Sequence, residues 1–109
     1  MTEDKTRRNI ALLQNIEQSI QTILLQKQSF QNQVIEIDSA LSELKDKKTA
    51  YKIVGNIMVS CSKDDLEKEL EEKKLKLDLR IKNLEKQEQS LKKKAEQMQK
   101  EVVEKLKKD

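Results

Sequence analysis

"AYKIVGNIMVSCS", residues 50–62, decides the fold, because it interrupts a chain whose remaining composition is typical of helices. It contains the only glycine of the chain, Gly55, and the sequence has no proline. The segments 51–54 and 57–61 are rich in the aliphatic and β-branched side chains typical of strands. Gly55-Asn56 between them suits a two-residue turn of type II′, in which glycine takes a positive φ. The stretch therefore predicts a β-hairpin over residues 50–61.

The composition on either side of the hairpin favours long helices over a compact globule. Charged residues make up 39% of the chain and aromatic residues 2%. Bulky apolar groups that could offset the entropy of a folded chain are therefore scarce. High charge and low hydrophobicity are also typical of disordered chains, so the spacing of the apolar residues has to decide between the two states.

The first helix, predicted over residues 6–47, carries an apolar stripe with alternating spacings of three and four residues. Nine of its ten positions are apolar, and Lys27 is the exception. A stripe sustained over so many heptads is typical of a coiled coil and argues against disorder. These positions, the seam of the first helix, are Leu13, Ile16, Ile20, Ile23, Lys27, Phe30, Val34, Ile37, Leu41 and Leu44.

The second helix, predicted over residues 63–107, follows Ser62, which is a suitable N-cap, and has two aspartates in its first turn. Its seam is less apolar than that of the first helix. Leu75 and Leu79 form a second apolar edge, which should face something other than the first helix. The seam positions of the second helix are Leu70, Lys74, Leu77, Ile81, Leu84, Glu88, Leu91, Ala95, Met98 and Val102.

The two helices should pack antiparallel, because the hairpin between them reverses the chain. The fold class is then mainly α, a long coiled-coil helical hairpin with a β-hairpin at its centre. In this register Lys27, the polar exception of the first seam, lies opposite Glu88 of the second. We interpret the pair as the device that fixes the register, which is a known use of polar pairs in coiled coils. The alternative is that both charges snorkel outward into solvent.

The β-hairpin should be unstable alone, because a two-stranded ribbon is marginal in water and both its edges carry unpaired N–H and C=O groups. Hairpins from several chains can join into a shared sheet or barrel, which removes the edges. The alternative is a hairpin folded back on its own helix pair. We favour the shared barrel. The residues predicted to take part in subunit assembly are then Tyr51, Ile53, Val54, Gly55, Ile57, Met58 and Val59.

Several function classes are disfavoured. The net charge is only +3, with seven basic and seven acidic residues before residue 50 and fifteen and thirteen after residue 62, whereas nucleic-acid binding needs a concentrated basic face. There is no histidine, no glycine-rich phosphate loop and no metal-ligand spacing around Cys61, so we expect no enzyme, no metal and no cofactor.

Membrane association is disfavoured as well. No apolar run approaches the ~20 residues that span a bilayer, and the polar faces mix both signs of charge, unlike an interfacial membrane helix. The start, "MTEDKTRRNI", lacks the apolar core of a signal peptide, and a single cysteine fits a reducing compartment. We therefore expect a cytoplasmic protein.

Short motifs accompany the helix–hairpin–helix order: "YKIVGNIMV" at residues 51–59, "KQEQSL" at 86–91, "QKQ" at 26–28 and "ALSEL" at 40–44. Together these residues resemble the β-type subunit of prefoldin, in its archaeal more than its eukaryotic form, over residues 9–106. The resemblance implies a hexameric, ATP-independent chaperone of two α-type and four β-type chains, whose hairpins build a double β-barrel platform. It also implies that the ends of the coiled coils bind non-native polypeptides, which then pass to a group II chaperonin.

The client-binding tip implied by this resemblance is formed by the two ends of the chain. Leu12 and Val103 lie off the seam, so a closed helix pair leaves them facing solvent. Helix ends also fray readily, because their last turns lack backbone partners. For the seam members the alternative is ordinary packing at the end of a coiled coil, and for the whole chain it is a structural scaffold without chaperone activity. The predicted tip residues are Ile10, Leu12, Leu13, Ile16, Met98, Val102, Val103 and Leu106.

Overall fold

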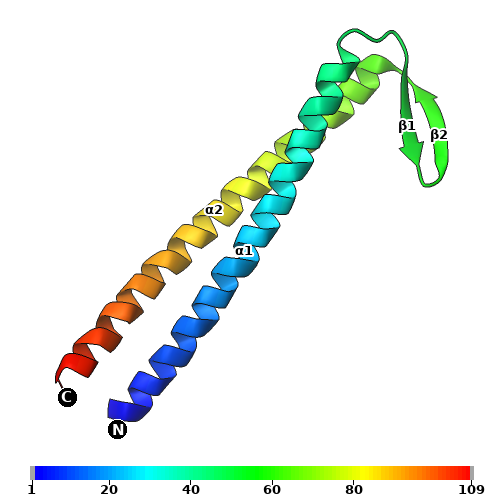
Figure 1. Ribbon diagram of the computed structural model, residues 1–109. Helices are drawn as coiled ribbons and strands as arrows, with labels where there is room; N and C mark the ends of the chain where they lie inside the picture. The colour runs from blue at the N-terminus through cyan, green and yellow to red at the C-terminus, as the bar shows by residue number, and fades with distance from the viewer. Residues whose placement is uncertain (1, 109) are drawn as a thin grey trace. The chain divides into compact units, whose positions relative to one another are not determined.

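The computed structural model describes residues 2–108, which form two helices and two strands (Figure 1). Helix α1, Thr2–Leu44, is followed by strand β1, Ala50–Val54, strand β2, Ile57–Cys61, and helix α2, Lys63–Lys108. The predicted fold class, two long helices with a β-hairpin between them, is confirmed.

The chain divides into two compact units, which are described separately. The tip unit combines the residues up to 28 with those from 82 onward, and the hairpin unit comprises residues 29–81. In the tip unit, an ion pair between Lys27 and Glu88 joins α1 to α2. Both ends of the chain belong to the tip unit, and the β-hairpin belongs to the hairpin unit.

The hairpin unit contains antiparallel segments of α1 and α2. The guanidinium of Arg80 lies 5.8 Å from the centre of the Phe30 ring, and Lys74 Nζ lies 2.7 Å from Asp38 Oδ1. The contacting residues rise in number along α1 as they fall along α2, so the two segments run in opposite directions.

The apolar core follows the two predicted seams. All ten seam positions of each helix are buried or half-buried. Because a helix pair can bury only one stripe of each partner, this core is thin, and no large side chain among residues 3–107 is fully buried. The most buried seam residues are Ile23, Ile37, Leu44, Leu77, Glu88 and Val102.

Helix α1 differs from its predicted span of 6–47 at both ends. It begins at Thr2, where Glu3 and Asp4 in the first turn favour the positive end of the helix dipole. It ends at Leu44, the last seam residue, where the Lys47 N–H donates to the Leu44 carbonyl at 3.2 Å. The polar run after Leu44 offers no apolar residue to bury, so nothing extends the helix. Lys63 Nζ also donates to the Lys45 carbonyl at 2.9 Å, which ties the start of α2 to the end of α1.

The β-hairpin has a two-residue turn. Strands β1 and β2 pair antiparallel, and Val54 lies opposite Ile57 next to the turn. Gly55 has φ 63°, whereas no other described residue has a positive φ. A type I′ turn needs positive φ at both central residues, so this φ pattern is that of type II′, as the sequence predicts. After β2, the Leu66 N–H donates to the Ser62 carbonyl at 3.0 Å, which places Ser62 at the N-cap of α2.

Candidate assembly and binding surfaces

The β-hairpin has two unlike faces, because directly opposed residues share a face and side chains alternate along each strand. Six residues share the first face and four share the second. The first face consists of Ala50, Lys52, Val54, Ile57, Val59 and Cys61, and the second of Tyr51, Ile53, Met58 and Ser60.

Only the base of the first face is covered. Ala50 is 4% exposed, and Lys52 Nζ lies 3.3 Å from the Glu69 carboxylate of α2. On the second face, Ile53 is 71% exposed and Met58 67%. Contact between the hairpin and the helices of its own chain is therefore limited to the base of the first face. Folding back, the alternative to a shared barrel, does not cover the apolar side chains of the hairpin. The predicted assembly residues are all exposed: Tyr51, Ile53, Val54, Gly55, Ile57, Met58 and Val59.

The edges of the hairpin are open, because the described sheet has only two strands. In a hairpin with a two-residue loop, the pair next to the turn is hydrogen-bonded, and hydrogen-bonded pairs alternate with pairs whose N–H and C=O groups point outward. The outward-pointing backbone groups therefore belong to Tyr51 and Ile53 on β1 and to Met58 and Ser60 on β2. The second face and the open backbone groups thus come from the same four residues.

The predicted tip residues fall into two sets. Four are exposed, and Leu106 is the most exposed of them, at 63%. The other four follow the seam. The exposed set consists of Ile10, Leu12, Val103 and Leu106; Leu13, Ile16 and Met98 are half-buried, and Val102 is buried.

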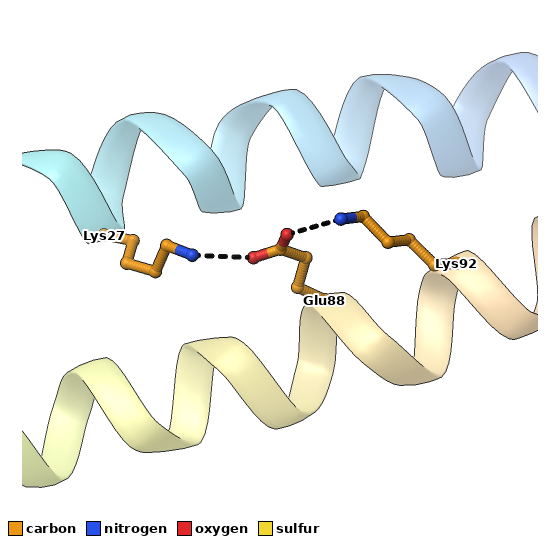
Figure 2. A network of polar contacts seen from close by, with 3 residues as sticks. All are labelled: Lys27, Glu88 and Lys92. Atoms are coloured by element: carbon orange, nitrogen blue, oxygen red, sulfur yellow. Dashed lines mark hydrogen bonds and ion pairs between the residues drawn. The ribbon is translucent and has the colours of Figure 1, made fainter.

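The predicted partners Lys27 and Glu88 are brought together in the tip unit. Lys27 Nζ lies 3.1 Å from Glu88 Oε2, and Lys92 Nζ lies 2.8 Å from Glu88 Oε1. Figure 2 shows the carboxylate between the two ammonium groups, one from each helix. Contact with Lys92, and then with Lys27, lowers the pKa of Glu88 below its ordinary value against the opposing effect of burial. Glu88 is the one buried charged residue among residues 3–107.

Sequence reasoning missed several polar contacts, among them three ion pairs. The partnership of Lys92 with Glu88 could have been found from their spacing of four residues on one helix. The ion pairs of Lys74 with Asp38 and of Lys52 with Glu69 join residues that no local pattern connects.

The described residues contain neither a group of side chains that could hold a metal ion nor a helix that could span a membrane. Within residues 2–108, no three His, Cys, Asp or Glu side chains are grouped so that they could hold a metal ion. In the same part of the chain, neither helix has a segment long and apolar enough to cross a membrane.

These features define a class of protein: a coiled-coil helical hairpin whose central β-hairpin has open edges and exposed apolar faces. The model of the prefoldin subunit family matches residues 7–109, and the chain belongs to this family.

Relatives of the chain carry the name prefoldin subunit beta. One from Saccharolobus islandicus is 37% identical over 102 residues, which cover 91% of this chain and 81% of the relative. One from Sulfolobus acidocaldarius is 35% identical over 99 residues, covering 88% and 79%. The crystal structure of the prefoldin beta subunit from Thermococcus strain KS-1 is 30% identical and has a TM-score of 0.84, covering 90% of this chain and 89% of that one. The resemblance to β-type prefoldin inferred from the sequence is confirmed.

Proposed function

We propose that this chain is a β-type subunit of a hexameric, ATP-independent chaperone that captures non-native polypeptides and passes them to a group II chaperonin. Its partners in the assembly are α-type prefoldin subunits and further β-type copies. It acts in the cytoplasm without a cofactor and catalyses no reaction. Family membership supports the role as a prefoldin subunit.

The second hairpin face supports the proposed assembly. Its apolar side chains are exposed, and the same residues direct their backbone N–H and C=O groups outward. A strand from a neighbouring subunit would pair with these backbone groups, and it would extend the sheet so that one face can close around a shared core. Closure of several hairpins into a barrel removes every open edge.

The observation that carries the proposed capture is the set of exposed apolar residues at the tip: Ile10, Leu12, Val103 and Leu106. Such a patch buries only a few hundred Å², worth at most several kcal/mol at ~25 cal/mol per Å² before ordering costs. Each tip should therefore bind weakly and exchange quickly. Several tips on one platform raise the effective concentration, so avidity supplies retention without a specific pocket.

The test is an aggregation assay of a chemically denatured client, diluted into the assembled complex without nucleotide. The triple variant Leu12→Ser, Val103→Ser, Leu106→Ser should lose most of the protection while the complex keeps its mass. Leu25→Ser is the matched control, because Leu25 is 67% exposed on α1 but is not a tip residue. Equal protection by the triple variant and the control would place client capture elsewhere.

A structural scaffold is the second candidate, and the open hairpin edges fit it equally well. A scaffold would bind its partners at fixed stoichiometry and would not delay aggregation. The unsubstituted complex in the same assay therefore distinguishes the two functions, since only the chaperone suppresses light scattering by the diluted client.

A further inference from the structure

The positive charge of the chain is concentrated in the tip unit. This unit contains thirteen basic and nine acidic residues, whereas the hairpin unit contains ten basic and eleven acidic residues. The tip unit therefore accounts for all of the net charge of +3. Nine of its thirteen basic residues belong to the α2 segment, whereas residues 9–28 of α1 contain only two charges, Glu17 and Lys27.

Four lysines of α2 recur at a spacing of seven residues along the side that faces away from α1. Each lies two residues from a seam position, and a step of about 100° per residue directs such a residue to nearly the opposite side of the helix. All four are exposed, and together they extend over about 31 Å at ~1.5 Å per residue. We call these residues the lysine row: Lys86, Lys93, Lys100 and Lys107.

The lysine row is not neutralised by the chain itself. Within residues 2–108, none of its four members forms an ion pair, whereas the adjacent Lys92 contacts Glu88. Glu96 and Glu104 lie within four residues of the later members and offset part of their charge. The earlier members meet less acid. They line a groove with one acidic residue, and its lining residues are Lys82, Glu85, Lys86, Gln89, Ser90 and Lys93.

The lysine row borders the exposed apolar residues of the tip. Val103 follows Lys100 by three residues and precedes Lys107 by four, so the three side chains are neighbours on one side of α2. Val103 and Lys100 also line one groove. A polypeptide segment that packs on Val103 therefore lies beside two ammonium groups. Positive charges without partners attract carboxylates and repel other cations, so the complementary segment is acidic.

We propose that the lysine row binds the acidic side chains of the non-native polypeptide held at the tip, so that clients with carboxylates among their apolar residues are preferred. The proposal rests on the capture described under the proposed function. Nucleic acid matches the surface less well, because Glu96 and Glu104 interrupt the row, and a phosphate backbone needs a concentrated basic face. A polypeptide can place carboxylates at the lysines and apolar groups at Val103.

The test uses two unfolded polypeptide probes with the same length and the same apolar residues. One probe carries aspartates at several positions, and the other carries asparagines there. Fluorescence anisotropy measures binding of each probe to the assembled complex of this chain with an α-type subunit. The acidic probe should bind about tenfold more tightly, since several exposed charge contacts each contribute modestly. Both probes should bind equally to the complex with the quadruple variant Lys86→Gln, Lys93→Gln, Lys100→Gln, Lys107→Gln.

Two matched variants separate the charge of the row from other effects of substitution. Arginine at the same four positions keeps the charge and should keep the preference for the acidic probe. A second quadruple variant removes four exposed lysines from the hairpin unit, none of which forms an ion pair within the described residues, and should also keep the preference. Its substitutions are Lys47→Gln, Lys68→Gln, Lys73→Gln and Lys76→Gln.

The outcomes distinguish this proposal from the proposed function. Equal binding of the two probes to a complex that still delays aggregation would overturn the role of the lysine row alone, as would a preference that survives its replacement by glutamine. Weaker binding of single-stranded RNA by the glutamine variant, with the acidic probe unaffected, would also overturn it and would assign the row to nucleic acid. A complex that binds neither probe and does not delay aggregation would overturn the proposed function itself.

Discussion

The two units use ion pairs between the helices in different ways. In the tip unit, Lys27 and Glu88 both occupy seam positions, and their side chains are 20% and 9% exposed. In the hairpin unit, Lys74 occupies a seam position but reaches Asp38 outside the seam, and these side chains are 37% and 50% exposed. The more exposed pair has the shorter distance, 2.7 Å against 3.1 Å.

We expect the burial of each pair, more than its N–O distance, to decide how much it contributes to stability. An exposed pair is screened by water and typically contributes little, whereas removing one partner of a buried pair leaves an uncompensated charge. A charge buried in the seam also penalises every register that would separate it from its partner. We therefore expect the tip unit to depend on its ion pair, and the hairpin unit to depend on apolar contacts made through the hairpin.

The largest expected effect concerns the hairpin. Ile53→Ser with Met58→Ser removes the apolar side chains of the second face and should abolish assembly with an α-type subunit, while the helical signal of the chain remains. Loss of these side chains removes apolar area that a closed barrel of hairpins would bury. Native mass spectrometry measures the complex. Normal assembly of this variant would contradict a role of the hairpin in assembly. Loss of assembly in the variant Leu12→Ser, Val103→Ser would show that the tip unit is needed for assembly as well.

The next largest effect concerns the two ion pairs. Glu88→Ala leaves two lysines facing each other beside the seam and should lower Tm by on the order of 5–10 °C, whereas Asp38→Ala should change it by less than about 2 °C. Thermal unfolding followed by circular dichroism measures both variants. Equal shifts in Tm would show that burial of the pair does not govern its contribution.

A charge reversal tests the register itself. Lys27→Glu should destabilise the tip unit, and adding Glu88→Lys should restore only part of the Tm. The recovery is incomplete because Lys92, which contacts Glu88 at 2.8 Å, would then face a like charge four residues away. Adding Lys92→Glu should complete it. If neither the double nor the triple variant recovers, the pair does not set the register.

Acid should remove the contribution of Glu88. Its pKa in the folded chain lies below the ordinary value of 4.5, so the carboxylate stabilises the fold fully above pH 4.5. This stability is lost as the pH falls through the lower folded pKa, when the carboxyl is protonated. The difference in Tm between the unsubstituted chain and Glu88→Gln should therefore be constant above pH 5 and shrink steadily below 4.5. A difference that stays constant down to pH 3 would contradict the assigned cause.

The sequence predicts the helices well because one physical requirement repeats along them: every third or fourth residue must face the partner helix. That repetition identifies each seam position and brings Lys27 opposite Glu88. The ends of α1 are less predictable, because the polar run after Leu44 is compatible with a helix by propensity although it offers no apolar residue to bury. The turn at Gly55 is predictable, since glycine is the residue that a positive φ favours.

The surfaces are only partly predictable. Exposure of Leu12 and Val103 follows from their place off the seam, as does that of Leu75 and Leu79. The pairing of Lys74 with Asp38 depends on the relative rotation of two helices, which a single sequence does not contain. The binding roles of the tip and the hairpin stay predictions, because they depend on partners outside the chain.

The smallest expected effect is at the exposed pair, and it appears at the opposite end of the pH scale. Contact with Asp38 raises the pKa of Lys74 above its ordinary value of 10.5. The stability that this ammonium contributes is therefore fully present below pH 10.5 and is lost as the pH rises through the higher folded pKa. Lys74→Met should lower Tm by no more than about 2 °C at pH 7, and this difference should shrink as the pH rises above 10.5. Lys73→Met, the neighbouring exposed lysine, controls for the change in net charge, because it removes the same charge without touching Asp38. If Lys74→Met lowered Tm as much as Glu88→Ala, the exposed pair would equal the buried one, and the distinction between the two units would not hold.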